Sequence, residues 1–190
     1  MVADNKVVFG LKNAHYAIIS EDAEGLHTYG TVLKLDGAVE ISLEPKGEQT
    51  DFFADDRLYY TTTSNQGYTT TLTVANIPND FRTEVLGEVL EPTDNVLTEN
   101  ANAKPKSIAF MFEFDGDIKA TRHLLYNCTV SRPPLSSATK TEAAEPTTQE
   151  LTLVAAPRPA DSIVRRSTTA ETPDTVYNGW YSGVYTPAVV

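Results

Sequence analysis

The stretch of residues 43–86 constrains the fold most, because it places four kinds of element next to one another. It begins in a strand whose apolar and polar residues alternate, and it continues through a long, charged, aromatic loop at residues 45–59. A threonine-rich strand at residues 68–74 and a short helix follow. The stretch contains neither a nucleophile motif nor a phosphate-binding glycine loop. Such an arrangement is typical of a surface on which chains pair with each other.

Strand patterns dominate the rest of the chain. Alternation predicts strands at residues 14–19, 31–35, 39–44, 68–74, 108–114, 121–130 and 151–155. Residues 133–148, rich in Ser, Thr, Ala and Pro, are interpreted as a loop. Two strands have pronounced apolar faces, made by Ile108, Phe110, Phe112 and Phe114 and by Leu124, Tyr126, Cys128 and Val130. We therefore predict a mainly β fold.

One short helix is predicted after Pro78. Asp80 suits the positive N-terminal end of a helix, and Gly87 is suited to the position just beyond its last turn. Phe81 and Val85 lie four residues apart and so cover one face. A helix of about two turns is not stable alone, and we expect it to pack on the sheet through these two side chains.

The C-terminal segment, residues 161–190, is aromatic near its end. Gly179 and Gly183 weaken any helix there. Because large apolar side chains are rarely left in water, we expect an arm that packs either on its own domain, residues 1–160, or on a neighbouring subunit. Two sets of side chains recur at four-residue spacing, Val176, Trp180 and Val184, and Tyr177, Tyr181 and Tyr185.

Composition excludes several function classes. The formal net charge is -11, from 15 Lys and Arg against 26 Asp and Glu, which argues against a protein that grips nucleic acid. The single cysteine, Cys128, permits no intramolecular disulfide. The first residues lack the apolar core of a secretion signal, and no apolar run is long enough to span a bilayer. We therefore expect folding in the cytoplasm where the chain is made.

No constellation of residues indicates catalysis or metal binding. His15, His27 and His123 have no Ser or Cys partner in a catalytic pattern. Asp115-Gly116-Asp117 lacks the spacing of a calcium loop, and there is no zinc-type Cys/His cluster. We predict no catalytic residues, no cofactor and no metal, a profile typical of a structural assembly protein.

Motifs along most of the chain resemble those of major tail proteins, the tail-tube subunits of bacteriophages with long, non-contractile tails. In order, they are VVFGLKNAHYAII, GAVEISLEPKGEQTDFFADDRLYYTTTSNQGY, IPNDFRTEVLGE, NANAKPKSIAFMFEFDGDIKATRHLLYNCTVSRP, EPTTQELTLVAAPRP and TVYNGWYSGVY. The resemblance implies a β-sandwich or barrel-like tail tube fold with one short flanking α-helix, a long inter-strand loop and a C-terminal arm.

The same resemblance implies the protein's partners and location. Six copies would form a ring, and stacked rings would make the tube around a tape-measure protein, ended by tail terminator and distal tail proteins. Genomic DNA would pass through the bore without sticking. The protein would reside in the virion tail after assembly in the cytoplasm of a host bacterium. The alternative from another class is a β-sandwich module that binds carbohydrate or a receptor at the tail tip or baseplate.

Two sets of candidate site residues follow. The loop at residues 45–59 is longer than the usual connection of about 4–6 residues, and we expect it to contact other subunits. Its candidate interface residues are Phe52, Phe53, Asp55, Asp56 and Tyr59. An acidic bore would keep DNA from sticking. The candidates to line it, on the polar side of predicted strands, are Glu40, Glu44 and Glu113.

Overall fold

The computed structural model describes residues 4–137, 139 and 146–187. Its main element is a nine-stranded antiparallel sheet with the order β2-β1-β10-β11-β12-β7-β4, in which β3 also pairs with β1 and β13 with β11. This confirms the prediction of a mainly β fold. The strands of this sheet are β1 Val8–Glu21, β2 His27–Tyr29, β3 Leu33–Lys34, β4 Ala38–Lys46, β7 Gly67–Val74, β10 Ile108–Gly116, β11 Thr121–Val130, β12 Gln149–Ala155 and β13 Arg165–Ser167.

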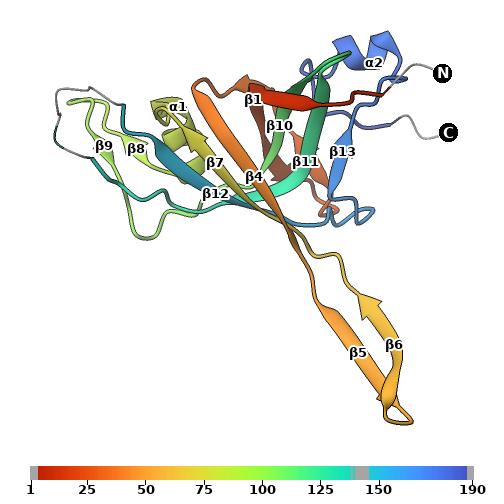
Figure 1. Ribbon diagram of the computed structural model, residues 1–190. Coiled ribbons are helices and arrows are strands. Elements are labelled where there is room, and N and C mark those ends of the chain that lie inside the picture. Colours follow the sequence, from red (N-terminus) through yellow and green to blue (C-terminus); the bar gives the residue numbers. More distant parts are fainter. Residues whose placement is uncertain (1–3, 138, 140–145, 188–190) are drawn as a thin grey trace.

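The sheet curves around a hydrophobic core, which gives a sandwich-like body with β4, β7 and β12 on one side and β1, β10 and β11 on the other (Figure 1). The predicted apolar stripe of β10 lies in this core, where Phe110 and Phe112 are almost fully buried. Two small sheets lie outside the main one. They pair β5 Gln49–Ala54 with β6 Arg57–Thr63, and β8 Val89–Leu90 with β9 Leu97–Thr98.

The predicted helix is present and covers one side of the core. Helix α1, Asn79–Phe81, continues into a π-helical turn, η1 Arg82–Leu86, and ends at Gly87 with a positive φ of 78°. Phe81 and Val85 are both buried, as expected from their spacing. The Phe81 ring meets Tyr16 of β1 edge-on, with ring centroids 4.9 Å apart, so the helix is attached to the sheet through its apolar face.

Strand β11 departs from the alternation that the sequence predicts. Its register with β10 shifts between the pairs Ile108–Cys128 and Phe110–Leu125. A one-residue bulge moves every later side chain to the other face of a sheet. Cys128 therefore lies in the core inside the sheet, whereas Leu124 and Tyr126 lie in a second cluster on the opposite face. The prediction that these side chains share one face is wrong.

The second face of β10 and β11 is covered by residues 168–187, here called the C-terminal cap. The cap contains helix α2, Asp174–Asn178, and its Trp180 is buried against Met111 and Leu124. The Tyr126 hydroxyl donates a hydrogen bond of 2.6 Å to the carbonyl of Tyr185. Of the two arrangements left open by the sequence, packing on the chain's own sheet is the one observed for these residues.

The predicted loop at residues 133–148 falls partly outside the described residues. Those of its residues that are described, 133–137, 139 and 146–148, form neither helix nor strand. Strand β12 begins directly afterwards and ends before Pro157, as the sequence predicts.

Candidate assembly surface

The most prominent surface is a β-hairpin that projects from the body (Figure 1). Strands β4 and β7 pair as far as Lys46 and Gly67. Beyond a short neck, the chain continues as β5 and β6. The prediction of a long loop at residues 45–59 is therefore wrong. Pro45 lies in β4, the last strand of the sheet's main path, where a proline is tolerated because the outer edge needs no backbone partner.

A tight turn at Asp55 and Asp56 makes the hairpin possible. Both residues have positive φ, 53° and 56°, and they connect the paired residues Ala54 and Arg57. Two left-handed central residues define the hairpin turn whose twist matches that of antiparallel strands. The usual sequence signal for this turn is Asn-Gly or Asp-Gly, so the Asp-Asp pair does not indicate a hairpin turn in the sequence.

The hairpin also has a polar ladder along its length. The carboxylate of Asp51 accepts hydrogen bonds from the Gln49 side-chain amide, at 3.0 Å, and from the Thr61 hydroxyl, at 2.9 Å. These bonds favour the ionised form and lower the pKa of Asp51 below its ordinary value. The ladder ties β5 to β6 across one face, but it supplies no hydrophobic core.

The hairpin exposes five large apolar side chains. Their exposed fractions are Phe52 59%, Phe53 65%, Leu58 52%, Tyr59 65% and Tyr60 62%. An isolated two-stranded hairpin is marginally stable in water, and a concentration of exposed apolar surface marks a contact site. Three candidate interface residues, Phe52, Phe53 and Tyr59, lie along its length, and Asp55 and Asp56 lie at its turn. Leu58 and Tyr60 join the set because β6 is a strand rather than a loop.

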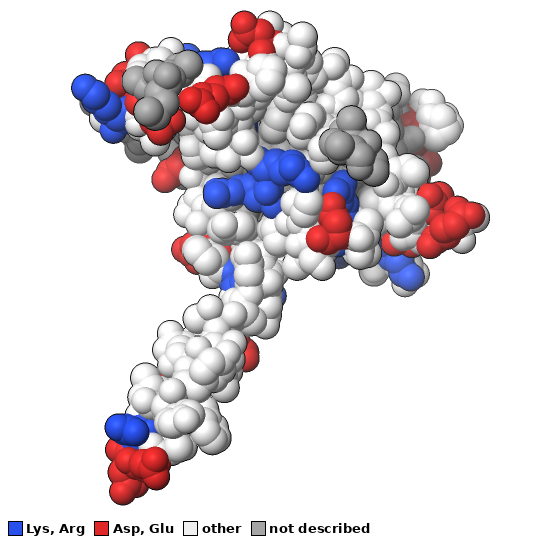
Figure 2. Space-filling model, turned by 90° about the vertical axis from the view of Figure 1, so that its right-hand side faces the viewer, with Lys and Arg blue, Asp and Glu red and all other residues white. Residues whose placement is uncertain are grey.

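The shaft of the hairpin carries few charged side chains, and at its tip acidic side chains lie beside a basic one, Arg57, which follows the turn (Figure 2). Asp55 and Asp56 are both exposed, and neither forms an ion pair with a described residue. The hairpin thus combines an apolar shaft with an acidic end.

A second surface contains two of the three candidate bore residues. Glu40 and Glu44 are exposed on β4, and the register pairs them with Thr73 and Thr69 of β7. On the far side of β7, Thr73 also pairs with Glu150 of β12, an acidic residue that sequence reasoning did not single out. We call this surface the Glu/Thr face. Its residues are Glu40, Ser42, Glu44, Thr69, Thr71, Thr73, Glu150, Thr152 and Val154.

Glu113 does not belong to that surface. Its exposed fraction is only 6%, and the Arg122 guanidinium donates a 2.8 Å hydrogen bond to one of its carboxylate oxygens. A buried, paired carboxylate is not available to line a bore. The prediction that Glu113 lines the bore is therefore wrong. The reason is the C-terminal cap, which covers the face of β10 that sequence parity marks as polar.

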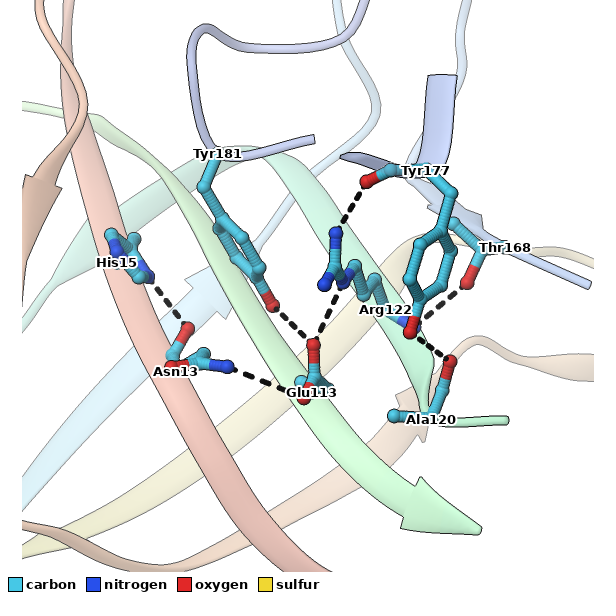
Figure 3. A network of polar contacts seen from close by, with 8 residues as sticks. All are labelled: Asn13, His15, Glu113, Ala120, Arg122, Thr168, Tyr177 and Tyr181. Carbon is cyan, nitrogen blue, oxygen red and sulfur yellow. Dashed lines mark hydrogen bonds and ion pairs between the residues drawn. The ribbon is translucent and has the colours of Figure 1, made fainter. Parts of the chain in front are cut away.

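The contacts of Glu113 fasten the cap to the sheet (Figure 3). The Tyr181 hydroxyl donates to the same oxygen that Arg122 contacts, at 3.4 Å, and the Asn13 side-chain amide donates to the other at 3.2 Å. Arg122 also donates to the backbone carbonyl of Tyr177, and its guanidinium lies over the Tyr177 ring, 3.8 Å from the centroid. Burial, followed by the negative charge of Glu113, raises the pKa of Tyr181. The network holds structure together and leaves no carboxylate oxygen free for chemistry.

The remaining titratable groups of the core are held neutral. His123 stacks on Phe112 with ring centroids 5.0 Å apart. Burial, with a smaller effect of the Arg165 charge, lowers the pKa of His123 to about 4. Burial likewise raises the pKa of the Cys128 thiol, which makes it an unreactive core residue. Among the described residues no three His, Cys, Asp or Glu side chains are grouped as a metal ion would require.

No described helix has the length and apolar character needed to cross a membrane. A scan against models of protein families returned no match for this chain, and a search of curated proteins returned no significant match.

Proposed function

We propose that the chain is a structural subunit of a phage tail tube, which polymerises into stacked, hexameric rings. The observation that carries the proposal is the projecting hairpin, which exposes Phe52, Phe53, Leu58, Tyr59 and Tyr60 at more than half of their surface. Such a hairpin gains stability by packing on another molecule. A protruding surface that fits a different surface on the next copy generates rings or filaments.

The Glu/Thr face is the proposed wall of the bore. Its nine residues include Glu40, Glu44 and Glu150, and the first basic residue on the same side of β4 is Lys46, at the base of the hairpin. Double-stranded DNA carries about one negative charge per 1.7 Å of axis. A wall of carboxylates and threonine hydroxyls repels that charge and so lets DNA slide past. The further partners are those of a tail: the tape-measure protein inside the tube and the terminator and distal proteins at its ends.

A hairpin replacement tests this proposal. Glu48 and Ser64 already bond across the neck, because the backbone N–H of Ser64 donates to the Glu48 carbonyl at 2.9 Å and the N–H of Glu48 to the Ser64 hydroxyl at 2.9 Å. Replacing β5, its turn and β6 (residues 49–63) by Asn-Gly would close the hairpin at this pair. Electron microscopy of the purified wild type is expected to show rings or tubes, and the replacement variant is expected to remain a folded monomer.

The same images separate the alternative function. Exposed aromatic rings such as Phe53 and Tyr59 also suit a module that binds carbohydrate at a tail tip. Such a module stays compact at every concentration and binds glycans. Wild-type protein that never forms rings or tubes, or a replacement variant that forms them as well as the wild type, would contradict the tail-tube proposal.

A further inference from the structure

A groove of about 350 Å³ lies where β13 meets the C-terminal cap. It is separate from the hairpin and from the Glu/Thr face, and none of its lining residues is acidic, although the chain as a whole has 26 Asp and Glu. The lining residues are Arg166, Ser167, Thr168, Thr172, Pro173, Val176, Trp180 and Tyr185.

Two hydrogen-bond donors at this groove have no acceptor. The indole Nε1 of Trp180 and the Nε of Arg166 are both buried and make no hydrogen bond with any residue that the structure describes. Trp180 as a whole is only 3% exposed. A buried donor without a partner costs about 1–3 kcal/mol, and more when it belongs to a charged group. These buried atoms do not face solvent, and the charge that the lining presents to a ligand is that of Arg166, which is only partly buried.

The charges around the groove point to an anionic ligand. Arg166 lines the groove and forms no ion pair with a described residue, whereas its neighbour Arg165 in β13 is not a lining residue and lies over the Tyr68 ring. The nearby carboxylate of Asp161 is already paired with Arg158. The side of the body on which β13 lies shows a compact group of Lys and Arg side chains (Figure 2). An arginine fork binds a carboxylate through two parallel hydrogen bonds.

We propose that this groove binds the acidic hairpin tip, Asp55 and Asp56, of a second copy of this chain. The proposal rests on the proposed function, since it names the surface that receives the hairpin. The tip presents two unpaired carboxylates in a fixed turn. The groove offers the positive charge of Arg166, with the apolar side chains of Val176, Trp180 and Tyr185 beside it.

The positions of the two surfaces fit head-to-tail stacking. The hairpin points away from the end of the body that carries α2, and β13 runs along one side of the body (Figure 1). Each copy would therefore offer a tip at the far end of its hairpin and a separate groove on its body. A contact between two different surfaces can repeat from copy to copy. The copies would then stack along the direction in which the hairpin points.

Trp180 is the only tryptophan of the chain, so its fluorescence reports on the groove directly. An acceptor is made by the hairpin replacement described above, which keeps the groove and lacks a tip. A donor is made by Trp180→Phe combined with Arg166→Glu, which keeps the tip, removes the positive charge of its own groove and is silent in tryptophan emission. Mixing the two limits association to the single proposed contact. We expect the Trp180 emission to shift as donor is added, and the shift to disappear when the donor also carries Asp55→Lys and Asp56→Lys.

Two results of this titration would overturn the proposal. One is an unchanged Trp180 emission on addition of the donor. The other is an equal shift with the charge-reversed donor, which would place the contact elsewhere. Inorganic phosphate, added at the same concentration as the donor, is a further test. An equal shift of the Trp180 emission with phosphate alone would show that the groove binds anions in general and does not recognise the hairpin tip.

A charge exchange in the full chain separates this proposal from the proposed function. Asp55→Lys with Asp56→Lys, and separately Arg166→Glu, are each expected to lower the yield of sedimentable tubes by at least about tenfold. Combining the three changes is expected to restore most of the yield. Arg165→Glu, on the same strand but outside the groove lining, is the matched control and is not expected to rescue the tip variant. The hairpin replacement could abolish tubes while the charge exchange fails to restore the tube yield. In that case the groove is not the surface that receives the tip, and the tail-tube proposal stands.

Discussion

Two antiparallel, aromatic-rich strand pairs of this molecule have opposite surroundings. In β10, paired with β11, Phe110 is 0% exposed and Phe112 1%. In β5, paired with β6, Phe52 is 59% exposed and Phe53 65%. The residue types and the pairing are alike. The difference is that β10 is covered by the core on one side and by the C-terminal cap on the other, whereas the described part of the chain covers neither face of the hairpin.

In this chain an aromatic strand pair can form without being buried within the subunit. Moving a phenylalanine from water into a core contributes about 1.5–3 kcal/mol. β10 obtains that contribution within the subunit. The hairpin leaves the same contribution available for a contact with another molecule, which is the physical basis of the proposed assembly.

The largest expected difference in stability is between a buried phenylalanine of the body, Phe81 of α1, and an exposed one of the hairpin, Phe53. Phe81→Ala removes a buried ring that joins α1 to β1, and it is expected to lower the free energy of unfolding by about 3–5 kcal/mol. Phe53→Ala, the matched exposed control, is expected to change it by no more than about 0.5 kcal/mol. Urea denaturation of the monomer measures both. Equal losses in the two variants would remove the distinction between body and hairpin.

The next effect concerns the fastening of the cap. Glu113→Ala leaves the guanidinium of Arg122, which is 16% exposed, without its carboxylate. Removing one partner of a buried pair costs about 3 kcal/mol or more. Glu40→Ala, on the Glu/Thr face, is the exposed control and is expected to change stability little. The cap should loosen specifically, so faster hydrogen exchange at residues 174–187 is expected in Glu113→Ala. Unchanged exchange there would show that the cap is held by its apolar contacts alone.

A smaller effect is expected from His123 and depends on pH. Its pKa is lowered from 6.5 to about 4 in the folded protein, so the unfolded chain binds the proton more readily. The contribution of the neutral His123 side chain to the free energy of unfolding is fully present above about pH 6.5. It is lost progressively as the pH falls toward 4. Its size is about 2 kcal/mol, because solvent reaches part of the ring and reduces the full linkage value. Unfolding of the wild type and of His123→Phe across this range gives the difference. Parallel pH profiles for the two proteins would contradict the buried, neutral imidazole.

Much of the fold follows from the sequence because the apolar residues of the strands and of the helix recur with clear periods. Phe81 and Val85 were predicted to face the sheet from their spacing alone. The bulge in β11 was not predicted, since alternation assumes an uninterrupted ladder. Glu113 was placed on a polar face, since parity says nothing about a cap that follows much later in the chain. One signal was available: a hairpin between β10 and β11 sets Glu113 opposite Arg122, and opposite charges in register indicate a pair.

The order of the chain also gives the cap a role in timing. The hairpin precedes β10 in the sequence, and the cap follows β11 and β12. Synthesis proceeds at about 5–20 residues per second, so for seconds a growing chain has its hairpin but not the segment that covers Met111, Leu124 and Tyr126. During that time the groove beside Trp180 does not exist. A nascent chain can therefore offer a hairpin tip but cannot receive one, so a polymer would not be extended beyond such a chain until its synthesis is complete.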